Sequence, residues 1–400
     1  MTSGSSKPAR IEEVSIGNFR SLQKVTFKDM TPLTALLGPN GSGKSTFFDV
    51  FAFLSDCFSE GLRRAVDKRG KFSDLRSRGQ TGPITFEVAY REGGLIDGER
   101  PKLIRYRLEI DEMDGRPVVV AEWMRWRRSY PGYPFKFLDY KLGQGEVVSG
   151  TTPEHNDARI TTPLAGPDVL AVSTLGQLAD NPRVKSLRDF IVGWHLSYLS
   201  TTETRVVPEA GPQEHLSRNG NNLANVIQYL SERHPTILAH IFATLRRRIP
   251  RLETVEPISL PTGHLLLTVK DAPFDEGVQA RYVSDGTLKM LAYLIQLHDP
   301  TPAPFLGIEE PENFLHPKLL YELAEECEVA SGRMQMVVTT HSPFFIDALT
   351  PKQVWALRRN AQGYTEAVRA SAMAGIQEQI EAGAKLGQLW TEGFFEAGNP

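Results

Sequence analysis

The sequence predicts an α/β fold with a mixed β-sheet and helices, together with an antiparallel β lobe and a helical lobe. Three observations support this class. First, short β-prone apolar runs occupy residues 33–37, 304–308 and 334–340. Second, runs with apolar residues at helical spacing lie at 46–58, directly after the first strand, and at 288–297, ahead of the second. Third, a block of alternating strand-like runs separates these segments, and a set of helical runs follows it.

Taken in order, the elements begin with expected strands at 11–16 and 25–27, which lead into the strand at 33–37. The β-rich block comprises 84–91, 103–110, 118–128 and 135–142, with a turn at 111–115 that is typical of antiparallel hairpins. Residues 150–166 are rich in Thr, Pro, Asn and Asp, which indicates a loop between lobes. The helical runs that follow are short and are interrupted by Pro235 and Pro250, so a long coiled coil is excluded.

The bulk composition excludes several classes of protein. The chain has 400 residues, enough for one large or two ordinary domains, and a formal net charge of −3, which argues against wholesale coating of nucleic acid. Its two cysteines, Cys57 and Cys327, lie in helical apolar patterns and suit buried reduced thiols. No run approaches the roughly 20 apolar residues of a membrane span. We therefore expect a cytoplasmic protein that does not enter a membrane.

One segment carries the strongest chemical signal. The eight residues at 38–45 satisfy the phosphate-loop pattern G-x-x-x-x-G-K-[ST] and join a predicted strand to a predicted helix. Backbone N–H groups of such a loop surround phosphates, Lys44 reaches the β- and γ-phosphates, and the Ser45 hydroxyl binds Mg²⁺. The predicted contacts with a nucleoside triphosphate are Gly38, Pro39, Asn40, Gly41, Ser42, Gly43, Lys44, Ser45 and Thr46. The alternatives are a glycine-rich turn and a G-x-G-x-x-G loop; Thr46 stands where the latter requires glycine.

The strand at 304–308 ends in the acidic run Glu309-Glu310-Pro311-Glu312. Carboxylates at such a strand end hold Mg²⁺ and the attacking water in phosphate-loop enzymes. We assign Glu309 to the metal and Glu310 to the water. Because a residue before proline avoids the α region, Glu310 is expected to stay extended, with the two carboxylates pointing to opposite sides. The alternative is a solvated turn.

Two further segments lie near predicted strand or helix ends. His341 follows the run at 334–340, where it could hydrogen-bond the γ-phosphate; the alternative is a structural histidine. Ser284, Asp285 and Gly286 precede the helical run to 297. They could simply cap that helix, or they could form a second phosphate-binding helix terminus that acts on another subunit.

The order of these motifs resembles the ABC-type ATPase heads of the RecF, SMC and OLD group. It is most similar to short bacterial ATPases with an AAA-type core domain of the AbiEii type. The resemblance is carried by residues 16–22, 38–46, 284–287, 308–317, 339–343 and 386–390. It implies that Ser284 to Thr287 form the signature loop that completes a partner subunit's ATP site, and that residues 313–316 form the D-loop at that interface. It also implies a nucleotide contact by Arg20 and an Mg²⁺-contacting glutamine, for which Gln177 is the candidate.

Two positions depart from the family pattern. Glu309 stands where aspartate is usual, and Asp285 replaces a glycine of the signature loop. Only 59 residues follow His341, so we expect no nuclease domain after it. The resemblance then implies a single ABC-type head over residues 1–400, with a nucleotide-binding core at 11–60 and 255–400, a β insertion at 83–150 and a helical lobe at 167–252.

The leading hypothesis is an ATPase that uses ATP and Mg²⁺ and acts as an ATP-gated homodimerisation switch in DNA maintenance or repair, or in phage defence. One alternative is a poorly hydrolysing ATP-binding regulator of a partner effector protein. Another is the nucleotide-binding subunit of a transporter, against which the β insertion and the altered signature loop argue. DNA contact could come from Arg125, Arg127 and Arg128 beside two tryptophans, or from Arg246, Arg247, Arg248 and Arg251. These arginines could equally form a solvated strand face and complement a helix dipole.

Overall fold

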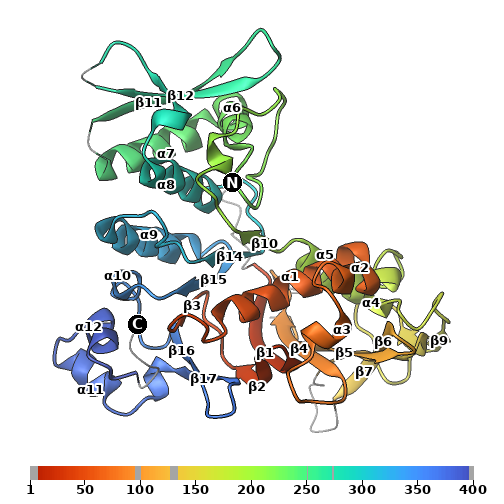
Figure 1. The fold of residues 1–400 in the computed structure, drawn as a ribbon. Coiled ribbons are helices and arrows are strands. Elements are labelled where there is room, and N and C mark those ends of the chain that lie inside the picture. The colour runs from red at the N-terminus through yellow and green to blue at the C-terminus, as the bar shows by residue number, and fades with distance from the viewer. Residues whose placement is uncertain (1–7, 95–100, 127–133, 250, 273, 396–400) are drawn as a thin grey trace.

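A six-stranded sheet lies at the centre of the computed structural model, which describes residues 8–94, 101–126, 134–249, 251–272 and 274–395 (Figure 1). Five of its strands are parallel and the last is antiparallel. In spatial order they are β10 (His195–Ser197), β14 (Phe305–Glu309), β15 (Gln335–Thr340), β3 (Leu33–Leu37), β16 (Val354–Arg359) and β17 (Thr365–Arg369). The strands predicted at 33–37, 304–308 and 334–340 are therefore confirmed as neighbours in one sheet.

Alternate residues of this sheet enter two different cores, as the period-two geometry of a strand requires. Leu36 and Val337 face a core shared with helix α1 (Lys44–Glu60). Their neighbours Ala35 and Val338 face the opposite core, which is shared with α8 (Asp285–Leu297) and α9 (Pro317–Ala330). Both faces are thus covered, which is why these strands are almost continuously apolar.

Helix α1 is held by aromatic packing. The Phe51 ring stacks on Phe305 of β14 with ring centroids 4.7 Å apart, and it lies 5.1 Å from the Trp194 ring. Phe47 packs against Phe27 at 4.4 Å. Because the helix is fixed along its length, the loop that precedes it is fixed as well.

The second sheet is antiparallel and has eight strands. In spatial order these are β2 (Leu22–Phe27), β1 (Arg10–Phe19), β4 (Ile84–Arg91), β5 (Ile104–Met113), β6 (Arg116–Trp126), β7 (Phe135–Lys141), β8 (Gln144–Val148) and β9 (Arg159–Thr161). The four predicted strands of the β-rich block are present; the last two residues of the third lie outside the described residues. The strands predicted at 11–16 and 25–27 belong to this sheet, because β1 pairs with β4.

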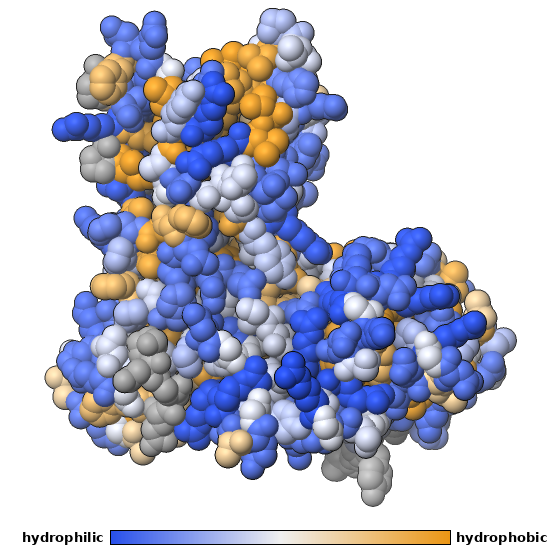
Figure 2. Space-filling model, in the orientation of Figure 1, coloured by the Kyte–Doolittle hydropathy of each residue, from blue (hydrophilic) through white to orange (hydrophobic). Residues whose placement is uncertain are grey.

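A smaller lobe lies beside α8. It contains α6 (Leu223–Arg233), α7 (Pro235–Arg248) and a three-stranded sheet of β11 (Leu252–Ser259), β12 (Leu265–Asp271) and β13 (Val278–Gln279). Hydrophobic surface is visible on this lobe in the region of α6 and β12, whereas hydrophilic residues dominate the lobe of the eight-stranded sheet (Figure 2). The short helices are α2 (Leu62–Asp67), α3 (Phe72–Leu75), α4 (Ala171–Leu175), α5 (Pro182–Val192), α10 (Pro343–Ile346), α11 (Ile376–Glu381) and α12 (Leu386–Thr391).

Among the described residues, every helix is too short or too polar to cross a bilayer.

Candidate active site

The phosphate-loop segment connects β3 to α1, and its glycines are required by the backbone. Gly43 has φ +110° and sits directly before the first turn of α1. A Cβ atom there would lie 2.2 Å from Thr365 Oγ1, so no other residue fits without displacing its neighbours. The backbone N–H groups at the start of α1 have no partner within the helix, which makes this end suited to an anion.

Lys44 lies across the loop and is almost completely buried. Its Nζ donates to the carbonyl oxygens of Gly38 at 2.7 Å and Pro39 at 3.2 Å, and it lies 3.7 Å from Glu310 Oε1. Burial lowers the pKa of Lys44, while Glu310 and Glu312 oppose that shift. The ammonium is therefore held next to the strand end that carries the acidic residues.

The register of the parallel strands β14, β15 and β3 places their carboxyl ends side by side. In the parallel sheet Thr340 pairs with Leu37, and Glu309 pairs with Thr339. The residues that follow these strands are the phosphate loop, Glu310 and His341, so the structure brings the three predicted groups to one edge of the sheet. This is the edge where open α/β sheets bind their ligands.

Glu309 lies next to Ser45, and these two residues are the ones expected to contact Mg²⁺. Burial raises the pKa of Glu309, and a hydrogen bond from the Ser45 hydroxyl lowers it in part. A carboxylate and a hydroxyl are the hard oxygen ligands that Mg²⁺ prefers, and Mg²⁺ ordinarily completes its shell with phosphate oxygens and waters. The pair fits that pattern. No cluster of three or more His, Cys, Asp or Glu side chains suited to a metal occurs in the described parts of the chain.

Glu310 does not have the predicted extended backbone. Its φ is +41°, in the left-handed region, so the expectation drawn from Pro311 is wrong. The Glu310 N–H still makes the parallel ladder hydrogen bond to the Thr339 carbonyl at 2.9 Å, while the Glu310 carbonyl accepts the Asn313 N–H at 3.2 Å, so a turn over 310–313 begins directly at the strand end. A non-glycine residue in this region costs about 1–2 kcal/mol, and such strain is concentrated at functional sites.

Glu312 holds the end of β15 and was not assigned a role from the sequence. Its Oε1 accepts the backbone N–H of His341 at 2.6 Å and lies 2.9 Å from His341 Nδ1. Its Oε2 accepts from Thr340 Oγ1 at 3.0 Å, and the side chain is only 8% exposed. These contacts place Nδ1 of the imidazole beside the Glu312 carboxylate. The sequence feature that could have identified Glu312 was its place as the third glutamate of the acidic run.

Tyr198 lies at the carboxyl end of a fourth strand of the same sheet. It follows β10, and its ring packs edge-on against Phe48 with centroids 5.2 Å apart. Burial raises the pKa of Tyr198 to about 12, and the nearby charge of Glu309 adds to the shift. β10 is only three residues long, so its periodicity gave no sequence signal.

Gln177 lies elsewhere. Its Nε2 donates to the Ser173 carbonyl at 3.1 Å, and Ser173 Oγ donates to the Phe58 carbonyl near the last turn of α1. Ser45 is in the first turn, 13 residues earlier, which is about 20 Å along a helix. The assignment of Gln177 to Mg²⁺ is therefore not supported, because the glutamine is at the wrong end of α1.

Arg20 lies beside the phosphate loop. Its Nη1 is 2.9 Å from Asp49 Oδ2 on α1, and it lines a cavity of about 660 Å³ together with Thr46, Arg76, Arg78 and Arg359. The lining also contains Asp74, and Arg20 and Arg76 are already paired with Asp49 and Asp111, so Arg78 and Arg359 supply the positive charge that favours an anion; Thr46 places the cavity at the mouth of the phosphate loop.

Ser284 caps α8, since its Oγ accepts the Thr287 N–H at 3.2 Å. Asp285 pairs with Arg205 at 2.6 Å. A Cβ on Gly286 would lie 3.1 Å from the Phe314 carbonyl, so this loop packs closely on residues 313–316. In the described chain no hydrogen bond or ion pair links Ser284, Asp285 or Gly286 to the phosphate loop.

Two of the arginines considered as DNA contacts, Arg125 and Arg248, lie beside acidic side chains. Arg125 stacks on Trp123 at 4.5 Å and lies 3.9 Å from Glu87 within an alternating ladder of charges. Arg248 pairs with Glu322 at 3.2 Å and Glu326 at 2.6 Å. Arg127 and Arg128 lie outside the described residues. The solvated-face interpretation of Arg125 accounts for its contacts.

The sheet order and the arrangement of phosphate loop, acidic strand end and histidine define a phosphate-loop nucleoside triphosphatase fold of the ABC-type head class. A family profile described as "AAA domain, putative AbiEii toxin, Type IV TA system" matches residues 33–347. The chain belongs to this family, as the motifs at 38–46 and 308–317 predicted. No curated protein sequence matched it.

Solved structures agree on the fold. An SMC head bound to the C-winged helix domain of ScpA superimposes with a TM-score of 0.55 at 16% identity, covering 90% of this chain and 97% of that one. An SMC head with an extended coiled coil from Pyrococcus furiosus gives 0.52 at 15% identity, covering 93% and 100%. At these identities the likeness establishes the fold. The chain spans nearly the full length of both heads.

Proposed function

We propose that this protein binds ATP with Mg²⁺, hydrolyses it, and uses it to close a homodimer of two heads. The observation that carries the proposal is the gathering of Lys44, Glu309, Glu310 and His341 at the carboxyl ends of adjacent parallel strands. The family to which the chain belongs is described by an AAA domain, which supports the ATPase part of this proposal.

The chemistry follows from the side chains. Lys44 would hold the β- and γ-phosphates, and Glu309 with Ser45 would hold Mg²⁺, which neutralises charge on the phosphates. Glu310 would accept the proton of the attacking water, because its carboxylate lies at the strand end beside Lys44. His341, oriented by Glu312, would donate to the γ-phosphate from Nε2.

The proposed dimer interface is the surface around Ser284. Large aromatic side chains are exposed on the segments next to it: Tyr282 is 70% exposed and Phe314 66%. Exposed aromatics of this kind are enriched at protein interfaces. The free N–H groups at the start of α8 would then face the γ-phosphate held by the other subunit.

The test is mass measurement of Glu310→Gln with and without ATP, alongside turnover by the wild type. We expect the variant to be monomeric without ATP and dimeric with ATP. We also expect the wild type to release phosphate from ATP and the variant to release none. ATP binding with no turnover by the wild type would favour the poorly hydrolysing regulator instead. A monomer under all conditions, with ATP bound, would refute the composite site.

A role for the closed dimer in DNA maintenance or phage defence rests on the family description, which names a toxin, and on the head bound to ScpA. By analogy we propose an effector protein that recognises the ATP-bound dimer. Direct DNA contact is the weaker proposal, since two of the five described candidate arginines, Arg125 and Arg248, already lie beside acidic side chains. A DNA shift by the ATP-bound protein at about 50 mM salt, where phosphate contacts are strong, tests it.

A further inference from the structure

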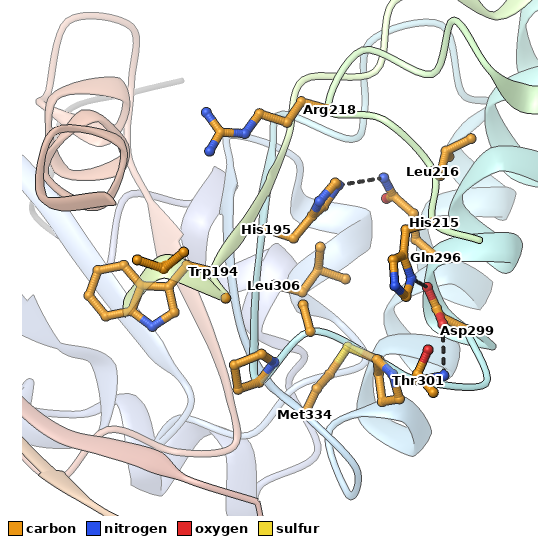
Figure 3. Close-up of a pocket in the computed structure, with 15 residues that line it drawn as sticks. Trp194, His195, His215, Leu216, Arg218, Gln296, Asp299, Thr301, Leu306 and Met334 are labelled. Carbon is orange, nitrogen blue, oxygen red and sulfur yellow. Dashed lines mark hydrogen bonds and ion pairs between the residues drawn. The ribbon is translucent and has the colours of Figure 1, made fainter. Parts of the chain in front are cut away.

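A second cavity lies at the opposite end of the central sheet from the phosphate loop (Figure 3). It has a volume of about 480 Å³ and is bordered by the first residue of β10, the start of β14 and Met334, which precedes β15. Leu306 in its wall and Glu309 at the nucleotide site are three residues apart on β14, about 10 Å along the strand. The two sites are therefore separate, although they share strands.

The cavity has the composition of a small-molecule site. Its volume falls within the roughly 300–1,000 Å³ of known ligand pockets. Leu216, Pro302, Pro304, Leu306 and Met334 form an apolar wall, and polar groups come from three other segments of the chain. An apolar wall with a few fixed polar groups is the usual design of such sites.

Hydrogen bonds fix the orientation of the polar side chains in this cavity. Ser197 Oγ donates to Gln296 Oε1 at 3.0 Å, so the amide nitrogen of Gln296 faces His195 Nε2 at 3.3 Å. His195 Nε2 must then accept, and the proton lies on Nδ1. Burial lowers the pKa of His195 to about 4, with smaller contributions from Arg218 and His215, so the ring is neutral near pH 7.

The single carboxylate of the lining is already satisfied. Asp299 Oδ2 lies 2.8 Å from His215 Nδ1, and Asp299 Oδ1 accepts the Thr301 N–H at 2.8 Å. Arg218 is an exposed residue at the rim of the cavity, and its guanidinium has no hydrogen-bonding or ionic partner among the residues that the structure describes; His195 Nδ1 likewise has none. The cavity thus offers unused donors and one unpaired positive charge beside an apolar wall.

We infer that this cavity binds a small organic anion, with its apolar body against Leu306 and Met334 and its anionic group between Arg218 and His195. A guanidinium and an N–H donor suit a carboxylate or a similar oxyanion, because charge-assisted hydrogen bonds are the stronger kind. Among the described lining residues Asp299 is the only carboxylate, and both of its oxygens are already engaged by His215 and Thr301, so the lining favours an anion over a cation.

The test uses 2-naphthoate as the anionic probe and 2-naphthylmethanol as its neutral counterpart, with the full chain and ligand-observed NMR. A probe of this size should bind with a Kd of about 1 mM. We expect naphthoate to bind about tenfold or more tightly than the alcohol, and Arg218→Gln to remove that advantage. Arg63→Gln, at an exposed arginine on α2, is the matched control and should leave the binding of both probes unchanged.

Two further measurements locate the probe. Ala303→Trp, which fills the cavity, should abolish binding, and saturating ATP should leave the naphthoate Kd unchanged. Equal binding of the two probes, unchanged binding in Arg218→Gln, displacement by ATP, or no binding up to about 10 mM would each overturn the inference. Because no arm needs ATP turnover or dimerisation, the result is independent of the proposed function.

Discussion

The Glu312→Gln variant tests how the histidine at the end of β15 is positioned. In the native protein one carboxylate makes three contacts: with the His341 N–H at 2.6 Å, with His341 Nδ1 at 2.9 Å and with Thr340 Oγ1 at 3.0 Å. Glutamine has nearly the same shape and keeps one oxygen acceptor but no charge. It should therefore preserve the fold and weaken the hold on the imidazole.

The magnitude follows from the loss of charge. Charge-assisted hydrogen bonds contribute about 1.5–3 kcal/mol and neutral ones about 1, so Glu312→Gln should lower the free energy of unfolding by about 1 kcal/mol. Glu312→Ala, which removes all three contacts to a buried strand end, should cost about 2–4 kcal/mol. If His341 contacts the γ-phosphate mainly in the transition state, Glu312→Gln should lower kcat about tenfold, equal to about 1.4 kcal/mol, with KM unchanged.

The assays are steady-state ATP turnover and denaturant unfolding, with Glu325→Gln on the exposed side of α9 as the control. The control should match the wild type in both. A kcat for Glu312→Gln equal to that of the wild type, in a protein that folds and binds ATP, would refute the positioning role. A tenfold rise in KM with kcat unchanged would instead show that Glu312 supports ground-state binding.

Three more predictions concern single residues. Glu122 is fully buried with a pKa raised to about 7 by burial, so between its ordinary value of 4.5 and 7 the native state binds more protons than the unfolded state. The free energy of unfolding should consequently fall by about 3 kcal/mol as the pH rises across that window, and Glu122→Gln should remove this slope; an unchanged slope contradicts it. Gly43→Ala should abolish ATP binding and cost about 2 kcal/mol or more, whereas Gly41→Ala, with φ +78° and no atom within 4 Å of its Cβ, should cost only about 1; equal effects would refute the clash with Thr365. Ser284→Ala should lose about 1 kcal/mol from the α8 cap and prevent the ATP-dependent dimer of Glu310→Gln while leaving ATP binding intact; a persisting dimer would remove Ser284 from the interface.

The parts of this site that the sequence could predict are local. The phosphate loop and His341 follow short strands, and Glu309 ends another; these runs are recognisable as largely apolar because both faces of the sheet are buried. Their position at one edge then follows from parallel strand geometry. Their roles in hydrolysis remain predictions.

The parts that the sequence could not predict depend on tertiary contacts. The left-handed backbone of Glu310 marks the point where the ladder between β14 and β15 ends and a turn over 310–313 begins, and this geometry outweighs the local preference before Pro311. The pairing of β1 with β4, across more than 60 residues, likewise depends on a sheet that no local pattern specifies. Gln177 was chosen by order along the chain, but α1 separates its loop from Ser45 by the length of a long helix.

Residues 309–314 connect the two halves of the proposed composite site. On one side Glu310 lies 3.7 Å from Lys44, and Glu312 orients His341. On the other side the Asn313 carbonyl accepts from Lys289 Nζ of α8 at 2.7 Å, and the Phe314 carbonyl packs against Gly286. Because one short loop contacts both the phosphate-binding strand ends and the helix capped by Ser284, we expect a shift of Glu310 or Glu312 on nucleotide binding to reach α8. This shared loop gives the proposed switch a physical path from the nucleotide to the dimer surface within a single subunit.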